Sequence, residues 1–177
     1  MKMLLAMLAL LLAGCVGKPD NVVPVNNFNA TKYLGKWYEI ARLDHSFERG
    51  LSNVTAEYSM RGDGSIKVLN RGYNAEKREW KDAEGKAKFV GPTDVAHLKV
   101  SFFGPAYGSY IVFDLDENYT HSLISGPDTS YLWILSRTPT MDEATKKRLV
   151  AKAQALGFDT SKLIYVKHEV NNNATSR

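Results

Sequence analysis

The sequence predicts an all-β protein: an eight-stranded antiparallel up-and-down β-barrel, followed by one C-terminal α-helix and a short final strand. Three observations lead to this prediction. Eight alternating apolar and polar runs follow one another between residues 37 and 137, with turn residues between them. The pattern changes to a helical one only at Thr140. Ala and Gly are frequent on the predicted inner faces, which favours a barrel that encloses a cavity.

The first strand begins at the triplet Gly35-Lys36-Trp37 and places Trp37, Glu39 and Ala41 on one face. Gly35 allows a sharp backbone turn, and Trp37 is large enough to plug one end of a barrel. A Gly-x-Trp triplet alone most often contains an ordinary core tryptophan, so its meaning depends on the strands that follow.

Seven further runs follow in order and cover residues 52–60, 65–73, 81–91, 95–103, 110–115, 119–125 and 131–137. Turn signals such as Arg61-Gly62-Asp63-Gly64 separate them. The loop from Phe102 to Gly108 is rich in aromatic residues, and it is interpreted as a lid, a membrane contact, a dimer surface or a segment folded back on the barrel.

The helix is predicted over residues 140–156, with a capping box at Thr140-Met141-Asp142-Glu143 and a stop at Gly157. A last short strand is expected at residues 163–166. The barrel domain therefore spans residues 26–170, and residues 171–177 are expected to be a disordered tail.

The N-terminus predicts export. A basic start and ten apolar residues precede Leu12-Ala13-Gly14-Cys15, which indicates a signal peptide over residues 1–14. The cleavage site resembles the bacterial lipobox, in which the cysteine, here Cys15, is lipid-modified and becomes the new N-terminus. Residues 15–25 then form the lipidated end and its tether, and Val16 in place of Asp favours the outer membrane.

Composition excludes several classes of function. The chain has one cysteine, which the anchor consumes, so a disulfide, a Cys nucleophile and a Cys metal site are not available. The formal net charge of +4 is dispersed and does not suggest nucleic acid. The four histidines form neither a Ser-His-Asp motif nor a metal-ligand spacing, so no catalytic residue, metal or cofactor is predicted. Haem binding through His121 is the least favoured alternative.

With these features the sequence resembles a lipocalin, and closely the bacterial outer-membrane lipocalin lipoproteins. Three segments carry the resemblance: Asn26 to Asp44 with Gly35-x-Trp37, Leu115-Asp116-Glu117-Asn118-Tyr119, and Leu135-Ser136-Arg137-Thr138-Pro139. The second segment departs from the usual Thr-Asp-Tyr of the family. The resemblance implies that Arg137 lies on Trp37 at the closed end of the barrel, so these two residues are interpreted as a structural pair and not as ligand contacts.

Ligand contacts are expected from the inward positions nearer the open end. The predicted lining is mostly apolar with a few phenols and suits an acyl chain; it consists of Glu39, Ala41, Ala56, Tyr58, Met60, Val68, Asn70, Leu98, Val100, Phe102, Tyr110, Val112, His121, Tyr131 and Trp133. For any single aromatic residue in this set, simple filling of the barrel is an equally good interpretation. A buried Glu39 needs a partner or a proton, which favours a ligand whose charged head stays at the mouth.

The sequence thus predicts a non-enzymatic carrier in the outer membrane that stores or transports a fatty acid such as palmitate, or a lysophospholipid, for maintenance of the envelope. A lipid-modifying enzyme and a structural envelope lipoprotein without a ligand are the alternatives. The resemblance also favours a homodimer.

Overall fold

The computed structural model describes residues 16–169 of the 177-residue chain. The predicted signal peptide, the lipidation at Cys15 and the predicted tail at residues 171–177 lie outside the described residues. Within residues 16–169, no helix is both long enough and apolar enough to cross a membrane.

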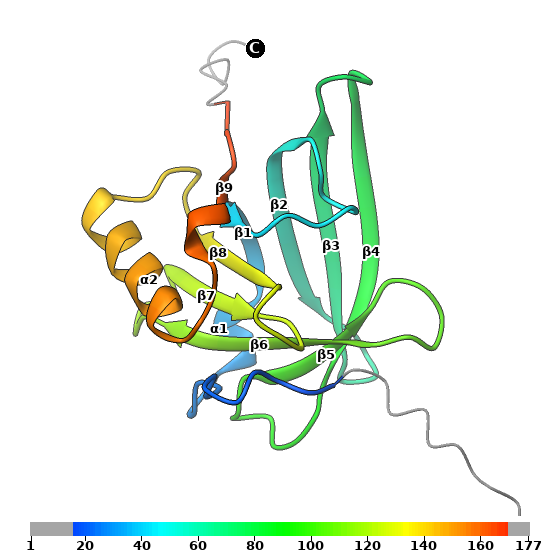
Figure 1. Ribbon diagram of the computed structural model, residues 1–177. Coiled ribbons are helices and arrows are strands. Elements are labelled where there is room, and N and C mark those ends of the chain that lie inside the picture. The colour runs from blue at the N-terminus through cyan, green and yellow to red at the C-terminus, as the bar shows by residue number, and fades with distance from the viewer. Residues whose placement is uncertain (1–15, 170–177) are drawn as a thin grey trace, which may run out of the picture.

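Strands dominate the described chain (Figure 1). The elements in chain order are α1 (Ala30–Tyr33), β1 (Gly35–Arg42), β2 (Leu51–Met60), β3 (Ile66–Asn74), β4 (Glu79–Phe89), β5 (His97–Ser101), β6 (Gly108–Leu115), β7 (His121–Ser125), β8 (Leu132–Ser136), α2 (Glu143–Ala155), the 3₁₀ turn η1 (Thr160–Lys162) and β9 (Ile164–Tyr165).

The strands β1 to β8 form a closed antiparallel barrel. Each strand pairs with the next one along the chain, and β1 closes the circle by pairing with both β2 and β8. The short β9 pairs with β1. The predicted fold class, an eight-stranded up-and-down barrel with one C-terminal helix and a short final strand, is confirmed.

The two ends of the barrel are built differently. The base is the end that carries α1 and the connections after β2, β4 and β6. The mouth is the opposite end, which carries residues 43–50, 75–78, 102–107 and 126–131. At the base, the Phe28 N–H donates to the Asp94 carbonyl, and the rings of Phe28, Tyr33 and Trp37 are at most 5% exposed. The base is therefore sealed by aromatic side chains.

Helix α2 lies on the outside of the barrel wall (Figure 1). Its buried residues Leu149 and Ala153 pack with Ile111, Phe113 and Ile134 in an outer core. Residues that alternate with these along the same strands, such as Val112 and Leu135, belong to an inner core that fills the lower barrel. Strands β6 to β8 are thus covered on both faces, which explains why they are apolar almost throughout.

Two local details differ from the sequence prediction. The sequence did not predict helix α1, a single turn that starts where the Asn29 side chain accepts a hydrogen bond from the Lys32 N–H. Helix α2 is capped by Asp142 and not by Thr140, because the Asp142 carboxylate accepts from the Thr145 N–H.

A bulge in β1 has a larger effect. The pairing of β1 with β8 shifts register between Glu39 and Ala41. Ile40 and Ala41 consequently both pack into the outer core, while Arg42 is only 1% exposed and forms an ion pair with Glu39. The bulge therefore turns Arg42 to the inner side of the wall.

Candidate functional site

The lumen of the barrel changes in character from base to mouth. Inward-facing residues in its lower half are buried: Tyr58 on β2 is 6% exposed, and Val68 and Leu98 are each 4% exposed. On each of these strands, the residue two positions nearer the mouth is only partly buried: Ala56, Asn70 and Val100. The upper lumen is therefore accessible to solvent, whereas the lower lumen is packed.

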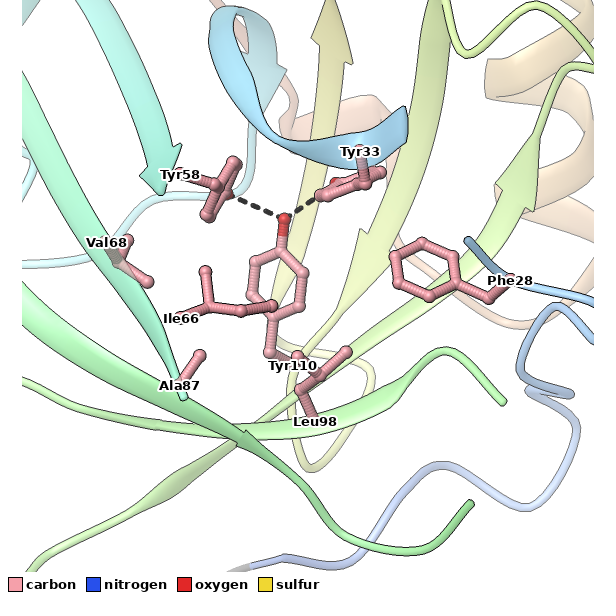
Figure 2. A pocket seen from close by; sticks show the side chains of 8 residues that line it. All are labelled: Phe28, Tyr33, Tyr58, Ile66, Val68, Ala87, Leu98 and Tyr110. Carbon is pink, nitrogen blue, oxygen red and sulfur yellow. Dashed lines mark hydrogen bonds between the residues drawn. The ribbon is translucent and has the colours of Figure 1, made fainter. Parts of the chain in front are cut away.

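Three tyrosines and a serine form the floor of the upper lumen. The Tyr110 hydroxyl points between Tyr33 and Tyr58 (Figure 2), at oxygen–oxygen distances of 2.8 Å and 2.7 Å. Ser122 lies 3.4 Å from the Tyr33 hydroxyl. Burial raises the pKa of Tyr33 to about 12 and raises the pKa values of Tyr58 and Tyr110 well above 10. All three therefore remain neutral hydroxyls that can both donate and accept.

Little space remains around this cluster. Figure 2 shows Phe28, Ile66, Val68, Ala87 and Leu98 around the three rings, and the cavity they enclose has a volume of about 10 Å³. That is at most enough for one water molecule. An acyl chain therefore fits only above the Tyr110 ring unless that ring moves.

A buried charged network lies nearer the mouth. Arg42 donates from Nη1 to Glu39 Oε1 at 2.7 Å and from Nη2 to the Glu48 carbonyl at 2.7 Å. The Trp133 indole N–H donates to Glu48 Oε2 at 2.9 Å. Glu48 belongs to the loop between β1 and β2 and is only 7% exposed, so this network ties the loop to the inside of the barrel.

Burial, and next the charge of Glu48, raise the pKa of Glu39 well above its ordinary value of 4.5. Burial also raises the pKa of Glu48, although the hydrogen bond from Trp133 and the charge of Arg42 oppose this. Both carboxyls therefore hold a proton to a higher pH than an exposed glutamate does, and the larger upward shift of the pKa is that of Glu39. When the pair holds one proton, the carboxylate that remains balances the charge of Arg42.

Aromatic side chains border the mouth above this network. The His45 ring stacks on Tyr131 at a centroid distance of 4.3 Å and on Phe47 at 5.3 Å. Trp133 approaches His45 at 5.5 Å. Burial lowers the pKa of His45, so its imidazole is neutral at neutral pH. Tyr131 thus lies at the rim and not deep in the lumen.

At the opposite end, the Arg137 guanidinium lies over the Trp37 ring, 3.9 Å from its centroid. It donates to the carbonyls of Tyr119, Lys36, Lys32 and Tyr33 at 2.9 to 3.2 Å. These contacts join α1, β1 and the connection after β6 at the base, away from the accessible lumen.

Three of the residues predicted to line the lumen lie elsewhere. The prediction for Ala41 is wrong because the β1 bulge places it in the outer core. The prediction for His121 is wrong because its ring faces outward, where it contacts Thr120, Asp116 and Arg148; this also removes the haem variant. Met60 ends β2 at the base and is 48% exposed, so it lies away from the upper lumen.

The other predicted lining residues face the lumen or its rim, and their contact with a ligand remains a prediction. The sequence interpretation missed Arg42, Glu48, Tyr33 and Ser122. A signal existed for Arg42, since a buried Glu39 requires a partner and Arg42 follows three residues later. Among residues 16–169, no three His, Cys, Asp or Glu side chains are arranged to hold a metal ion.

A closed antiparallel barrel with a sealed base, an accessible lumen and an outer helix defines the class of barrels that enclose one small ligand. The Lipocalin-like domain model matches residues 28–168. The chain therefore belongs to the lipocalin family, and like that family it is a binding protein and not an enzyme.

Relatives and solved structures agree with this assignment. The outer membrane lipoprotein Blc of Vibrio cholerae is 58% identical over 166 residues, which cover 93% of this chain and 97% of that protein. The protein of the same name from Escherichia coli K12 is 57% identical over 148 residues and 84% of each chain. Insecticyanin of the tobacco hornworm shares the fold, with a TM-score of 0.68 over 87% of this chain and 88% of its own, at 23% identity.

Proposed function

We propose that this lipocalin is an outer-membrane lipoprotein, anchored through Cys15, that holds the acyl chain of a fatty acid or lysophospholipid in its upper lumen. It stores or transports this lipid for maintenance of the envelope. The names of its relatives support the location, and the family supports the binding of a small hydrophobic ligand.

The observation that carries the proposal is the partial exposure of the inward-facing Ala56, Asn70 and Val100 above a closed floor, which indicates an upper lumen open to solvent. The proposed contacts above the floor are the predicted residues Glu39, Ala56, Asn70, Val100, Phe102, Tyr131 and Trp133, with the Tyr110 ring beneath them. Tyr58, Val68, Leu98 and Val112, which were also predicted to line the lumen, lie in its packed lower half and would contact a ligand only if Tyr110 moved. Apolar burial contributes about 0.8 kcal/mol per methylene group. Complete burial of about a dozen methylene groups would therefore contribute about 10 kcal/mol before the costs of association and ordering.

The polar groups support a tail-down orientation. Arg42 Nη1 is already bonded to the Glu39 carboxyl and Nη2 to the Glu48 carbonyl, so among the described residues the network leaves only the buried Arg42 Nε–H without a partner for a ligand carboxylate. A carboxylate placed beside Glu48 would also meet a like charge. The head group therefore stays at the mouth, which both fatty acids and lysophospholipids allow.

The proposal is tested by blocking the lumen. Ala56→Trp fills the space beside Trp37 and Asn70, and the adjacent Glu57→Trp places the same side chain on the exposed outer face. Titration with a fluorescent lysophospholipid should show binding by the wild type and Glu57→Trp but at least tenfold weaker binding by Ala56→Trp. Circular dichroism checks that both variants fold.

Two results would contradict the proposal. Equal affinity in folded Ala56→Trp would place the ligand outside the lumen. No binding to the wild type would instead favour a structural envelope lipoprotein whose barrel is filled by its own side chains. The predicted homodimer is a separate proposal, which light scattering of the purified lipoprotein tests.

A further inference from the structure

Large aromatic side chains are exposed at the mouth. Phe103 is 85% exposed, Phe47 is 62% exposed and Trp80 is 49% exposed. They come from the loop between β5 and β6, the loop between β1 and β2, and the start of β4. The up-and-down topology places all three segments at the same end of the barrel. The aromatic residues Phe28, Tyr33 and Trp37 at the base are by contrast buried.

Basic side chains accompany the aromatic residues of the mouth. The Arg71 guanidinium lies over the Trp80 ring at 4.7 Å, and the Lys99 ammonium lies over the Tyr107 ring at 5.1 Å. Aromatic rings beside long basic side chains suit the head-group region of a bilayer, where the rings contact acyl chains and the cations meet phosphates. Exposed apolar residues at the base, Met60 and Val90, are aliphatic.

The N-terminal segment lies along the outer wall of the barrel beside β5 and β6. From Phe28 at the base it runs along β5 and β6 (Figure 1), where Val25 bonds to Val112 and Ala96. The Ser109 hydroxyl donates to the Gly17 carbonyl at 2.5 Å, one residue from the mouth end of β6. The preceding Val16 bonds through its backbone to His97 at the start of β5, so a lipid on Cys15 would be tied to the outer wall beside β5 and β6.

From these observations we propose that the mouth of the barrel faces the membrane, with Phe47, Trp80 and Phe103 in the head-group region. The proposal rests on the anchor of the proposed function and adds its orientation. A lipid then passes between bilayer and lumen without crossing bulk water. It also interprets the 102–107 loop as a membrane contact, one of the alternatives that its sequence allows.

Two single-cysteine labels test this orientation in the full lipoprotein, because the lipidated sulfur of Cys15 cannot react. Ser46→Cys places a fluorophore at the mouth beside Phe47, and Ser59→Cys places it near the base; both serines are exposed. The proteins are reconstituted in phosphatidylethanolamine–phosphatidylglycerol vesicles that contain a nitroxide-labelled lipid. The mouth label should lose fluorescence and shift to the blue, and the base label should do neither.

Phe47→Ser combined with Phe103→Ser, in the Ser46→Cys protein, should reduce the quenching of the mouth label, whereas Val90→Ser should leave it unchanged. Equal quenching at the two label sites, or full quenching without the two phenylalanines, would overturn the proposal. Vesicle flotation distinguishes failure of the proposed anchor from failure of the proposed orientation. A protein that does not float refutes the anchor and the orientation together, and one that floats with equal quenching refutes the orientation alone.

Discussion

At the scale of the residue, Tyr110 determines how deep the lumen is. Its hydroxyl is held by both Tyr33 and Tyr58, and its ring fills the space above a cavity of about 10 Å³. A side chain whose hydroxyl has two buried partners is costly to displace, because its movement would leave those hydroxyls without hydrogen bonds. The length of acyl chain that the lumen accepts should therefore depend on this side chain.

Tyr110→Ala is expected to open the floor and shift the preference of the protein toward longer acyl chains. Tyr110→Phe keeps the ring and should leave the preferred length unchanged while lowering stability by about 1 to 2 kcal/mol. Competition between lysophospholipids of increasing chain length measures this preference. An unchanged length profile in a folded Tyr110→Ala protein would show that Tyr110 is not the floor.

Glu39 gives the fold a pH dependence. Its pKa in the folded state is raised above 4.5, so the folded protein binds more protons than the unfolded chain at pH values above that point. Its contribution to stability is complete below pH 4.5 and is lost as pH rises through the folded pKa. Gln resembles the protonated form, since it accepts from Arg42 and donates to Glu48.

Glu39→Gln should therefore match the wild type in acid, be more stable than the wild type at alkaline pH, and show a flatter dependence of the unfolding free energy on pH. Urea denaturation across this range measures the effect, with exposed Glu57→Gln as the control that keeps the wild-type slope. The raised pKa of Glu39 would be contradicted if the stability of the wild type rose with pH over this range and Glu39→Gln left that pH dependence unchanged.

At the scale of the element, the Arg137 contacts hold three segments together at the base. The guanidinium over Trp37 contributes about 0.5 to 2 kcal/mol, and its hydrogen bonds to carbonyls contribute further. We expect Arg137→Ala to lower the unfolding free energy by about 2 to 4 kcal/mol, with a smaller effect on ligand affinity. Arg137→Lys should recover only part of the loss, because an ammonium lacks the planar fork. Unchanged stability with lost binding would make Arg137 a ligand contact instead.

The strands were predictable because alternation reports which residues share a face. Where both faces of a strand are buried, the alternation does not show which face points into the barrel. Leu123 packs under α2, so its apolar character placed His121, on the same face, inside the barrel in error. The β1 bulge places Ala41 on the outer face of the wall and Arg42 on the inner face, and no glycine in the sequence indicates this bulge. Glu48 lies in a loop and Tyr33 in a four-residue helix, and both segments are too short or irregular for hydrophobic periodicity to show which residues point inward.

At the scale of the whole molecule, the barrel separates stability from binding. The aromatic side chains at the base and the outer core are buried, whereas the inward side chains of the upper lumen are partly exposed and Phe47, Trp80 and Phe103 are exposed at the mouth. This division lets a lipid enter and leave without disturbing the aromatic seal around Trp37. It also places the proposed ligand site and the proposed membrane contact at one end.

Native mass spectrometry of the lipoprotein, released from its own envelope in a mild detergent, tests the central claim most directly. We predict one bound lipid with a single acyl chain in the lumen, in addition to the covalent anchor, and loss of that lipid in Ala56→Trp but not in Glu57→Trp. Recovery of the ligand-free mass alone, or of the same lipid on the lumen-blocked variant, would contradict the account.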